Sequence, residues 1–121
     1  MNAAVPQPVE IRLNSTERAL EIDFDNETTL RYPAELLRVE SPSAEVQGHS
    51  PTEKKIISGQ RNVAIAGVQP TGNYAVIIQF DDGHDTGIFS WDYLYRLGLQ
   101  QDEIWQTYLN ALETNGLSRD P

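Results

Sequence analysis

Four side chains that could do chemistry lie within five residues, namely Asp81, Asp82, His84 and Asp85. Three carboxylates and one imidazole are a ligand set that a divalent cation accepts. The same segment contains Gly83 and stands between two apolar runs, and Asp and Gly are also the residues that tight turns require. We therefore expect an acidic hairpin turn here, and a cation site is the alternative interpretation.

The chain has one other histidine, His49, in a polar stretch far from this turn. A metal-binding protein would combine His49 and His84 with nearby carboxylates such as Asp82 and Asp85, and this is our alternative hypothesis of function. The spacing gives no reason for the two histidines to meet. No Gly-x-Ser-x-Gly elbow and no glycine-rich phosphate loop occurs. We therefore expect no enzyme activity and no cofactor.

Composition excludes several classes of protein. The 121 residues contain 18 Asp and Glu against 9 Lys and Arg, a net charge of −9, and no cysteine. Disulfide scaffolds, zinc ribbons and cysteine-ligated iron–sulfur sites need thiols, and nucleic-acid binders need clustered cations. No apolar run approaches the roughly 20 residues of a membrane helix, and the first residues do not resemble a secretory signal. We expect an acidic, cytoplasmic domain that binds neither nucleic acid nor membrane.

Hydrophobic periodicity predicts an α+β fold, mainly an antiparallel sheet of hairpins with short helices, the longest of them C-terminal. Alternation of apolar and polar residues, broken by turn residues, is the signal for strands. Ser90 is placed to cap a helix that would stop at Gly98. The predicted strands are 9–14, 20–25, 29–32, 54–57, 62–68, 74–80 and 86–89, and the predicted helices are 34–38, 90–98 and 100–113.

The elements divide the chain into four parts. We expect a flexible N-terminal tail at 1–8, one domain at 9–98, a C-terminal helix packed on it at 99–116, and a tail at 117–121. Residues 40–51 have no periodicity and form a loop long enough to suggest a function. The aromatic residues near the C-terminus are expected mainly to form core, and a contact with a partner is the alternative. Tyr93 is the better candidate for such a contact, because it lies off the apolar stripe of Trp91, Leu94 and Tyr95.

Several segments carry a family resemblance. The run FDDGHDTGIFSWDYL at 80–94 is the longest, and Leu37-Arg38, SPSAEV at 41–46 and GNYAV at 72–76 support it. Together they resemble the N-terminal domain of gamma-butyrobetaine hydroxylase and its relatives, a domain family of unknown function. The resemblance covers about residues 9 to 98 and implies a mainly antiparallel α+β fold.

The resemblance also implies the loss of a metal site. In the carnitine-pathway hydroxylases this domain holds zinc through a Cys-x-Cys-x-x-Cys segment and a later histidine. Those ligand positions fall here on Ser41, Ser43, Val46 and His84, and only the histidine is retained. Serine hydroxyls stay protonated at neutral pH and valine has no lone pair, so we expect no zinc.

The resemblance finally suggests a role. The dioxygenase domain that follows in the hydroxylases has no counterpart before this chain ends, so we do not expect that activity here. Related domains are also fused to P-loop ATPases of the iron–sulfur carrier type. We therefore expect a non-enzymatic accessory or protein-interaction domain whose partner is an iron–sulfur carrier or another metabolic enzyme. The candidate partner surface is Asp81, Asp82, His84, Asp85 and Tyr93, with the 41–50 loop beside it.

Overall fold

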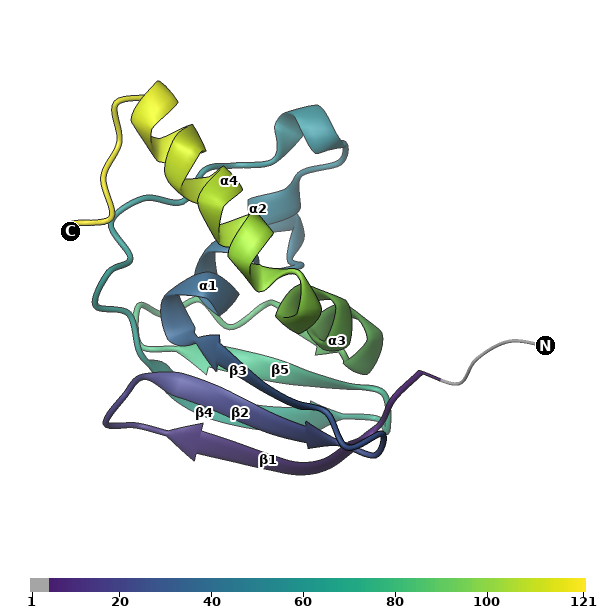
Figure 1. Cartoon of the computed structure of the whole chain (residues 1–121). Coiled ribbons are helices and arrows are strands. Elements are labelled where there is room, and N and C mark those ends of the chain that lie inside the picture. The colour runs from purple at the N-terminus through teal and green to yellow at the C-terminus, as the bar shows by residue number, and fades with distance from the viewer. Residues whose placement is uncertain (1–4) are drawn as a thin grey trace.

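The computed structural model describes residues 5–121, so residues 1–4 of the predicted N-terminal tail lie outside it. Two three-stranded antiparallel sheets form the base of the molecule (Figure 1). The first sheet has the order β1-β2-β3 and the second the order β4-β5-β6. The strands are β1 (Pro8–Asn14), β2 (Ala19–Phe24), β3 (Thr29–Pro33), β4 (Ile65–Thr71), β5 (Ala75–Phe80) and β6 (Ile88–Ser90).

The helices lie on one side of the sheets, with the longest helix C-terminal as predicted (Figure 1). They are α1 (Ala34–Val39), α2 (Ala44–Gln47), the short 3-10 helix η1 (Pro51–Glu53), α3 (Trp91–Leu99) and α4 (Gln101–Thr114). The predicted α+β class is therefore confirmed. Across residues 5–121, none of the helices combines the length and apolar character needed to cross a membrane.

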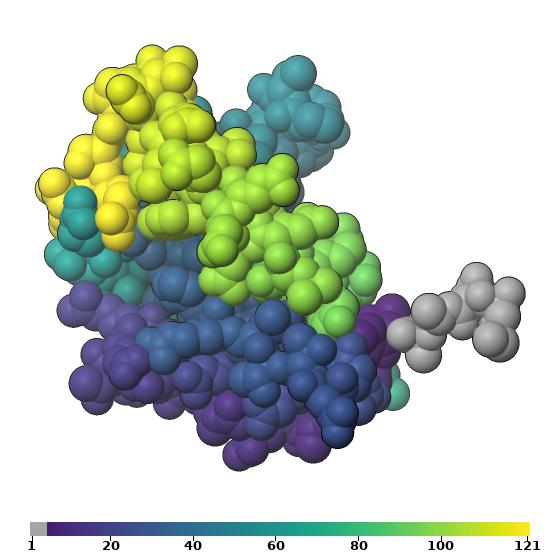
Figure 2. Space-filling model, in the orientation of Figure 1, coloured from purple at the N-terminus to yellow at the C-terminus, as the bar shows by residue number. Residues whose placement is uncertain are grey.

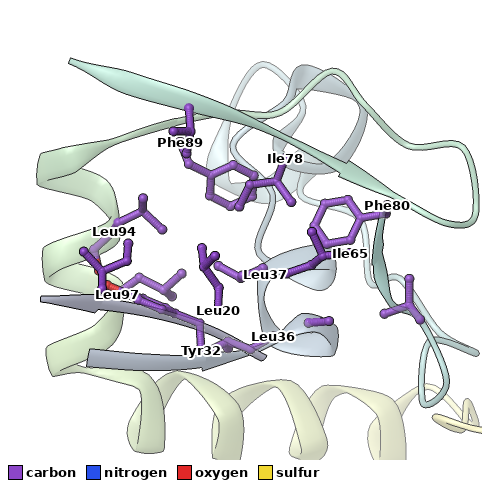
Figure 3. Close-up of a cluster of buried hydrophobic side chains, with 14 of the residues drawn as sticks. Leu20, Tyr32, Leu36, Leu37, Ile65, Ile78, Phe80, Phe89, Leu94 and Leu97 are labelled. Carbon is purple, nitrogen blue, oxygen red and sulfur yellow. The ribbon is translucent and has the colours of Figure 1, made fainter. Parts of the chain in front are cut away.

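The core lies between the two sheets, as the strand alternation predicts (Figure 3). Leu20 and Ile22 of the central strand β2 are fully buried, and so is Ile78 of β5, the other central strand. On the opposite face of β2, Glu21 and Asp23 stay outside and accept hydrogen bonds from Arg12 on β1. Period-2 alternation thus places one face of β2 in the core and the other in contact with water.

Two expectations about local structure are wrong. Residues 54–57 form no strand, because their backbone bonds to other elements instead: Lys55 donates its N–H to the Val46 carbonyl (2.7 Å), and the Ile57 carbonyl accepts from the Tyr108 hydroxyl (2.6 Å). Gly98 does not end the helix, since α3 continues to Leu99. A Cβ at Gly98 would lie 2.5 Å from the Leu30 side chain, so this glycine permits close packing of α3 on β3.

The C-terminal residues return along the body of the protein. Gly59 and Arg61 donate their backbone N–H groups to the carbonyls of Ser118 and Arg119, both at 2.9 Å. The Arg119 guanidinium makes two hydrogen bonds, of 2.8 and 2.7 Å, to the buried carboxylate of Glu35 on α1. Residues 117–121 therefore connect α4 to α1 and to the segment before β4.

Candidate functional site

The most concentrated polar group in the interior consists of Ser41, Ser43 and His84, which we call the Ser–His cluster. The His84 side chain is 3% exposed, and its Nε2 lies 2.9 Å from the Ser41 hydroxyl and 3.4 Å from the Ser43 hydroxyl. The two hydroxyl oxygens are 3.4 Å apart. Residues more than 40 positions apart in the sequence are therefore joined, and the connection between α1 and α2 is tied to the turn between β5 and β6.

Turn chemistry orients His84 toward the interior. The Asp82 carboxylate accepts the backbone N–H of His84 (3.0 Å), and the His84 carbonyl accepts the N–H of Phe80 (2.9 Å). Gly83 has φ of 92°, a left-handed conformation that favours glycine. The acidic hairpin turn predicted from Asp and Gly is thus what the structure contains.

The contacts among Ser41, His84 and Glu45 resemble the serine, histidine and carboxylate triad of a hydrolase. Glu45 Oε2 lies 3.4 Å from His84 Nδ1, on the side of the ring away from Ser41. A serine nucleophile must reach a substrate, however, and Ser41 has no exposed surface. Close packing is the cause, because a Cβ at Gly87 would lie 2.3 Å from the Ser41 hydroxyl oxygen. The arrangement therefore holds loops together and does not present a nucleophile.

Burial keeps His84 neutral at neutral pH. Desolvation lowers the pKa of His84 below its usual value, and the nearby Arg38 guanidinium lowers this pKa further. The carboxylates of Glu45, Asp82 and Asp85 act in the opposite direction but do not outweigh these effects. A neutral imidazole can accept from one serine hydroxyl, which matches its contacts in the Ser–His cluster.

This pKa shift predicts a pH dependence of stability. The unfolded chain binds a proton at His84 more readily than the folded chain, so the stabilising contribution is fully present above the unfolded pKa near 6.5. It is lost as pH falls from there toward the lower folded pKa. We expect the free energy of unfolding, measured with urea, to decline between about pH 7 and pH 5. His84→Gln should reduce this decline, and His49→Gln should leave it unchanged. Equal slopes in all three proteins would contradict this prediction.

The predicted partner surface is only partly accessible. Asp81, Asp82 and Asp85 are exposed, but the His84 side chain is only 3% exposed and offers a partner little surface. Tyr93 is half-buried: its hydroxyl donates to the Glu40 carbonyl, and burial raises the pKa of Tyr93. Tyr93 lies off the apolar stripe of α3 but still packs against the protein, because the α1–α2 connection covers that side of the helix.

The exposed carboxylates around the Ser–His cluster form what we call the acidic rim, consisting of Glu45, Asp81, Asp82 and Asp85. Two of them are held in place, since Asp81 accepts the N–H of Ala64 (3.0 Å) and Asp82 accepts from Arg38 (2.7 Å). The residue pattern alone predicts no role for Arg38 or Glu45. Both lie in segments of the family resemblance, Leu37-Arg38 and SPSAEV at 41–46.

The structure also shows where the predicted metal ligands lie. His49 is exposed, and its backbone N–H donates to Glu53 (2.7 Å). Within the described range 5–121, no three His, Asp or Glu side chains converge as a metal site would require. Ser41, Ser43 and His84 do meet, and Val46 is fully buried on the adjacent α2. Two neutral hydroxyls and an aliphatic side chain do not fit zinc, which takes thiolate, imidazole or carboxylate ligands.

The chain is a small α+β domain, in which two antiparallel sheets carry helices on one side. A buried Ser–His cluster joins two of its loops. Comparison with known families identifies the family to which the chain belongs. It belongs to the family described as gamma-butyrobetaine hydroxylase-like, N-terminal, whose model matches residues 11–95. This finding confirms the family resemblance on which the zinc-ligand positions were assigned.

Solved structures of similar proteins agree with this assignment. Two solution structures determined by NMR are 44% and 45% identical to the chain, with TM-scores of 0.84 and 0.83. The matches cover 98% and 96% of this chain, and 93% and 86% of the other chains. A crystal structure of a protein of unknown function from Acidithiobacillus ferrooxidans, of the DUF971 family, is 42% identical over 76% of this chain and 92% of that chain, with a TM-score of 0.65. A search of curated proteins gives no match.

Proposed function

We propose that the chain is a non-enzymatic accessory domain that binds a basic surface of a protein partner through the acidic rim. The observation that supports this proposal is a difference in exposure between neighbouring side chains. The serine hydroxyl beside His84 is enclosed and cannot act on a substrate, whereas the carboxylates around it are exposed and partly held in position. Carboxylates that are already positioned lose little side-chain freedom on binding.

Asp82 is anionic at any physiological pH. Partial burial alone would raise the pKa of Asp82, but hydrogen bonds from the His84 backbone N–H and from Arg38, together with the charge of Arg38, outweigh it and lower this pKa. Complementary charge increases the rate of encounter with a partner and selects its orientation. A partner with exposed Lys and Arg is therefore the chemistry that the rim accepts.

The family resemblance supports a narrower form of the proposal. Related domains occur fused to iron–sulfur carrier ATPases, so we place the partner within metallocofactor metabolism, as an iron–sulfur carrier or another metabolic enzyme. Such a partner would supply its own cluster ligands, because this chain has no cysteine.

Capture of partners from native lysate tests the proposal when the variants are matched. Asp85→Lys reverses one charge of the rim at an exposed position, and Asp102→Lys makes the same change at an exposed position of α4, outside the rim. We expect the wild type and Asp102→Lys to capture a common partner that moderate salt releases and that Asp85→Lys does not capture. Identical capture by all three proteins would reject the acidic rim.

The alternative hypothesis is metal binding through His49, His84, Asp82 and Asp85, and titration tests it on the same protein without a purification tag. Zinc, iron or manganese that binds the native state must raise the melting temperature. Heat of binding at sub-millimolar metal, with a rise in melting temperature that His84→Gln abolishes, would favour this alternative over the accessory role.

A further inference from the structure

A second candidate site lies on the helical side of the molecule. A pocket of about 430 Å³ opens between α4 and the irregular segment that follows η1. One wall is α4, the yellow-green helix at the top of Figure 2, and the other is the segment after η1, which passes behind this helix in Figure 1. The volume lies within the range of about 300–1,000 Å³ that is typical of small-molecule sites.

Much of the surface of this pocket is apolar. Ile104, Tyr108 and Ala111 line it from α4, Val39 lines it from the end of α1, and Ile56 lines it from the opposite wall. Ile56 remains 36% exposed although it faces these apolar neighbours. The pocket therefore offers apolar surface that the fold itself does not cover.

Hydrogen bonds hold the two walls at a set separation. The Tyr108 hydroxyl of α4 donates to the Ile57 carbonyl (2.6 Å), and the N–H of Lys55 donates to the Val46 carbonyl of α2 (2.7 Å). The segment is thus fixed on both sides of Ile56, and the pocket exists before a ligand arrives. Preformed sites bind with less loss of conformational freedom.

Both lysines of the chain, Lys54 and Lys55, line this pocket. Lys54 is paired with Glu40 at 2.7 Å. Seven of the nine Lys and Arg side chains have a carboxylate partner within the described residues, and the two that remain are Arg18 and Lys55. Arg18 lies in the turn between β1 and β2, so Lys55 is the unpaired cation that stands beside an apolar cavity.

We propose that this pocket binds a small amphipathic anion, with an apolar body against Ile104, Tyr108 and Ala111 and a carboxylate or phosphate head at the Lys55 ammonium. A lysine stem can cover apolar ligand atoms while its charge stays at the opening. Glu103 also lines the pocket, from α4, and its carboxylate opposes the anionic head. The proposal therefore predicts opposite effects of neutralising Lys55 and Glu103.

Titrations followed by amide NMR shifts and calorimetry test the pocket with four probes of equal chain length: decanoate, decyl phosphate, decylammonium and decanol. We expect decanoate or decyl phosphate to bind more tightly than the cation and the alcohol, with shifts confined to the pocket lining at 39–40, 54–57 and 100–111. The two anionic probes distinguish a carboxylate from a phosphate ligand. Preference for decylammonium, shifts elsewhere, or no binding of either anion at millimolar concentration would overturn the proposal.

Matched variants locate the head group. Lys55→Gln is expected to weaken decanoate binding about fivefold, the effect of a partly exposed charge pair, whereas Glu103→Gln strengthens it. Arg18→Gln removes the other unpaired cation outside the pocket and is the control, with unchanged binding expected. Ala111→Phe fills the cavity without changing a charge and is expected to abolish binding while near-ultraviolet circular dichroism shows a folded protein. Equal binding by Lys55→Gln and Arg18→Gln would reject this assignment of the head group.

Discussion

A variant that carries Ser41→Cys, Ser43→Cys and Val46→Cys is expected to bind one zinc ion, and the unchanged chain is not expected to bind one. Zinc with sulfur ligands at about 2.3 Å and nitrogen at about 2.0 Å places neighbouring ligand atoms roughly 3.5 Å apart. The two serine oxygens and His84 Nε2 lie 2.9–3.4 Å from one another. The backbone thus already brings three of the four positions together, and thiolates are the donors that it lacks.

The effect should be large because zinc binding stabilises only the folded chain. Structural zinc contributes about 10–16 kcal/mol of apparent binding free energy at pH 7 in small domains. Zinc uptake measured by competition with a chromogenic chelator, together with the melting temperature, checks the prediction. The same variant with His84→Ala is the control, since it removes the nitrogen ligand. A folded triple-cysteine protein that takes up no zinc would contradict the placement of these residues.

Arg119→Ala is expected to lower the free energy of unfolding by about 2 kcal/mol, less than the cost of breaking a fully buried ion pair, because the Arg119 side chain is 30% exposed. Glu35 is only 7% exposed, and both of its carboxylate oxygens accept from Arg119. The guanidinium also stands over the Trp105 ring at 5.3 Å. Removal of Arg119 leaves a buried carboxylate without these partners.

Urea unfolding of two further variants checks this explanation. Arg96→Ala breaks an exposed pair with Asp92 on α3 and should cost at most about 0.5 kcal/mol. Glu35→Gln combined with Arg119→Ala removes the buried charge itself and should recover part of the lost stability. A loss for Arg119→Ala that is no larger than for Arg96→Ala would show that the C-terminal residues contribute little to stability.

Local patterns predicted much of the fold. Ser90 accepts the N–H of Tyr93 and caps α3 as expected, and α4 occupies 101–114 where its apolar spacing indicated a helix at 100–113. The strand expected at 54–57 does not form, because nothing in its own residues reveals that its hydrogen bonds go to α2 and α4. Gly98 illustrates the same limit, since its packing on Leu30 involves a residue 68 positions earlier.

The sequence by itself determined the acidic turn at 81–85 and the absence of thiols, and through the family resemblance it suggested which positions correspond to zinc ligands in the hydroxylases. Only the tertiary structure decided that His84 and Tyr93 point inward, that Ser41 is enclosed, and that Lys55 stands beside an apolar pocket. The physical reason is the separation along the sequence over which each interaction acts. Turn chemistry, capping and periodicity act between residues a few positions apart, whereas burial and ion pairing depend on which distant loops pack together.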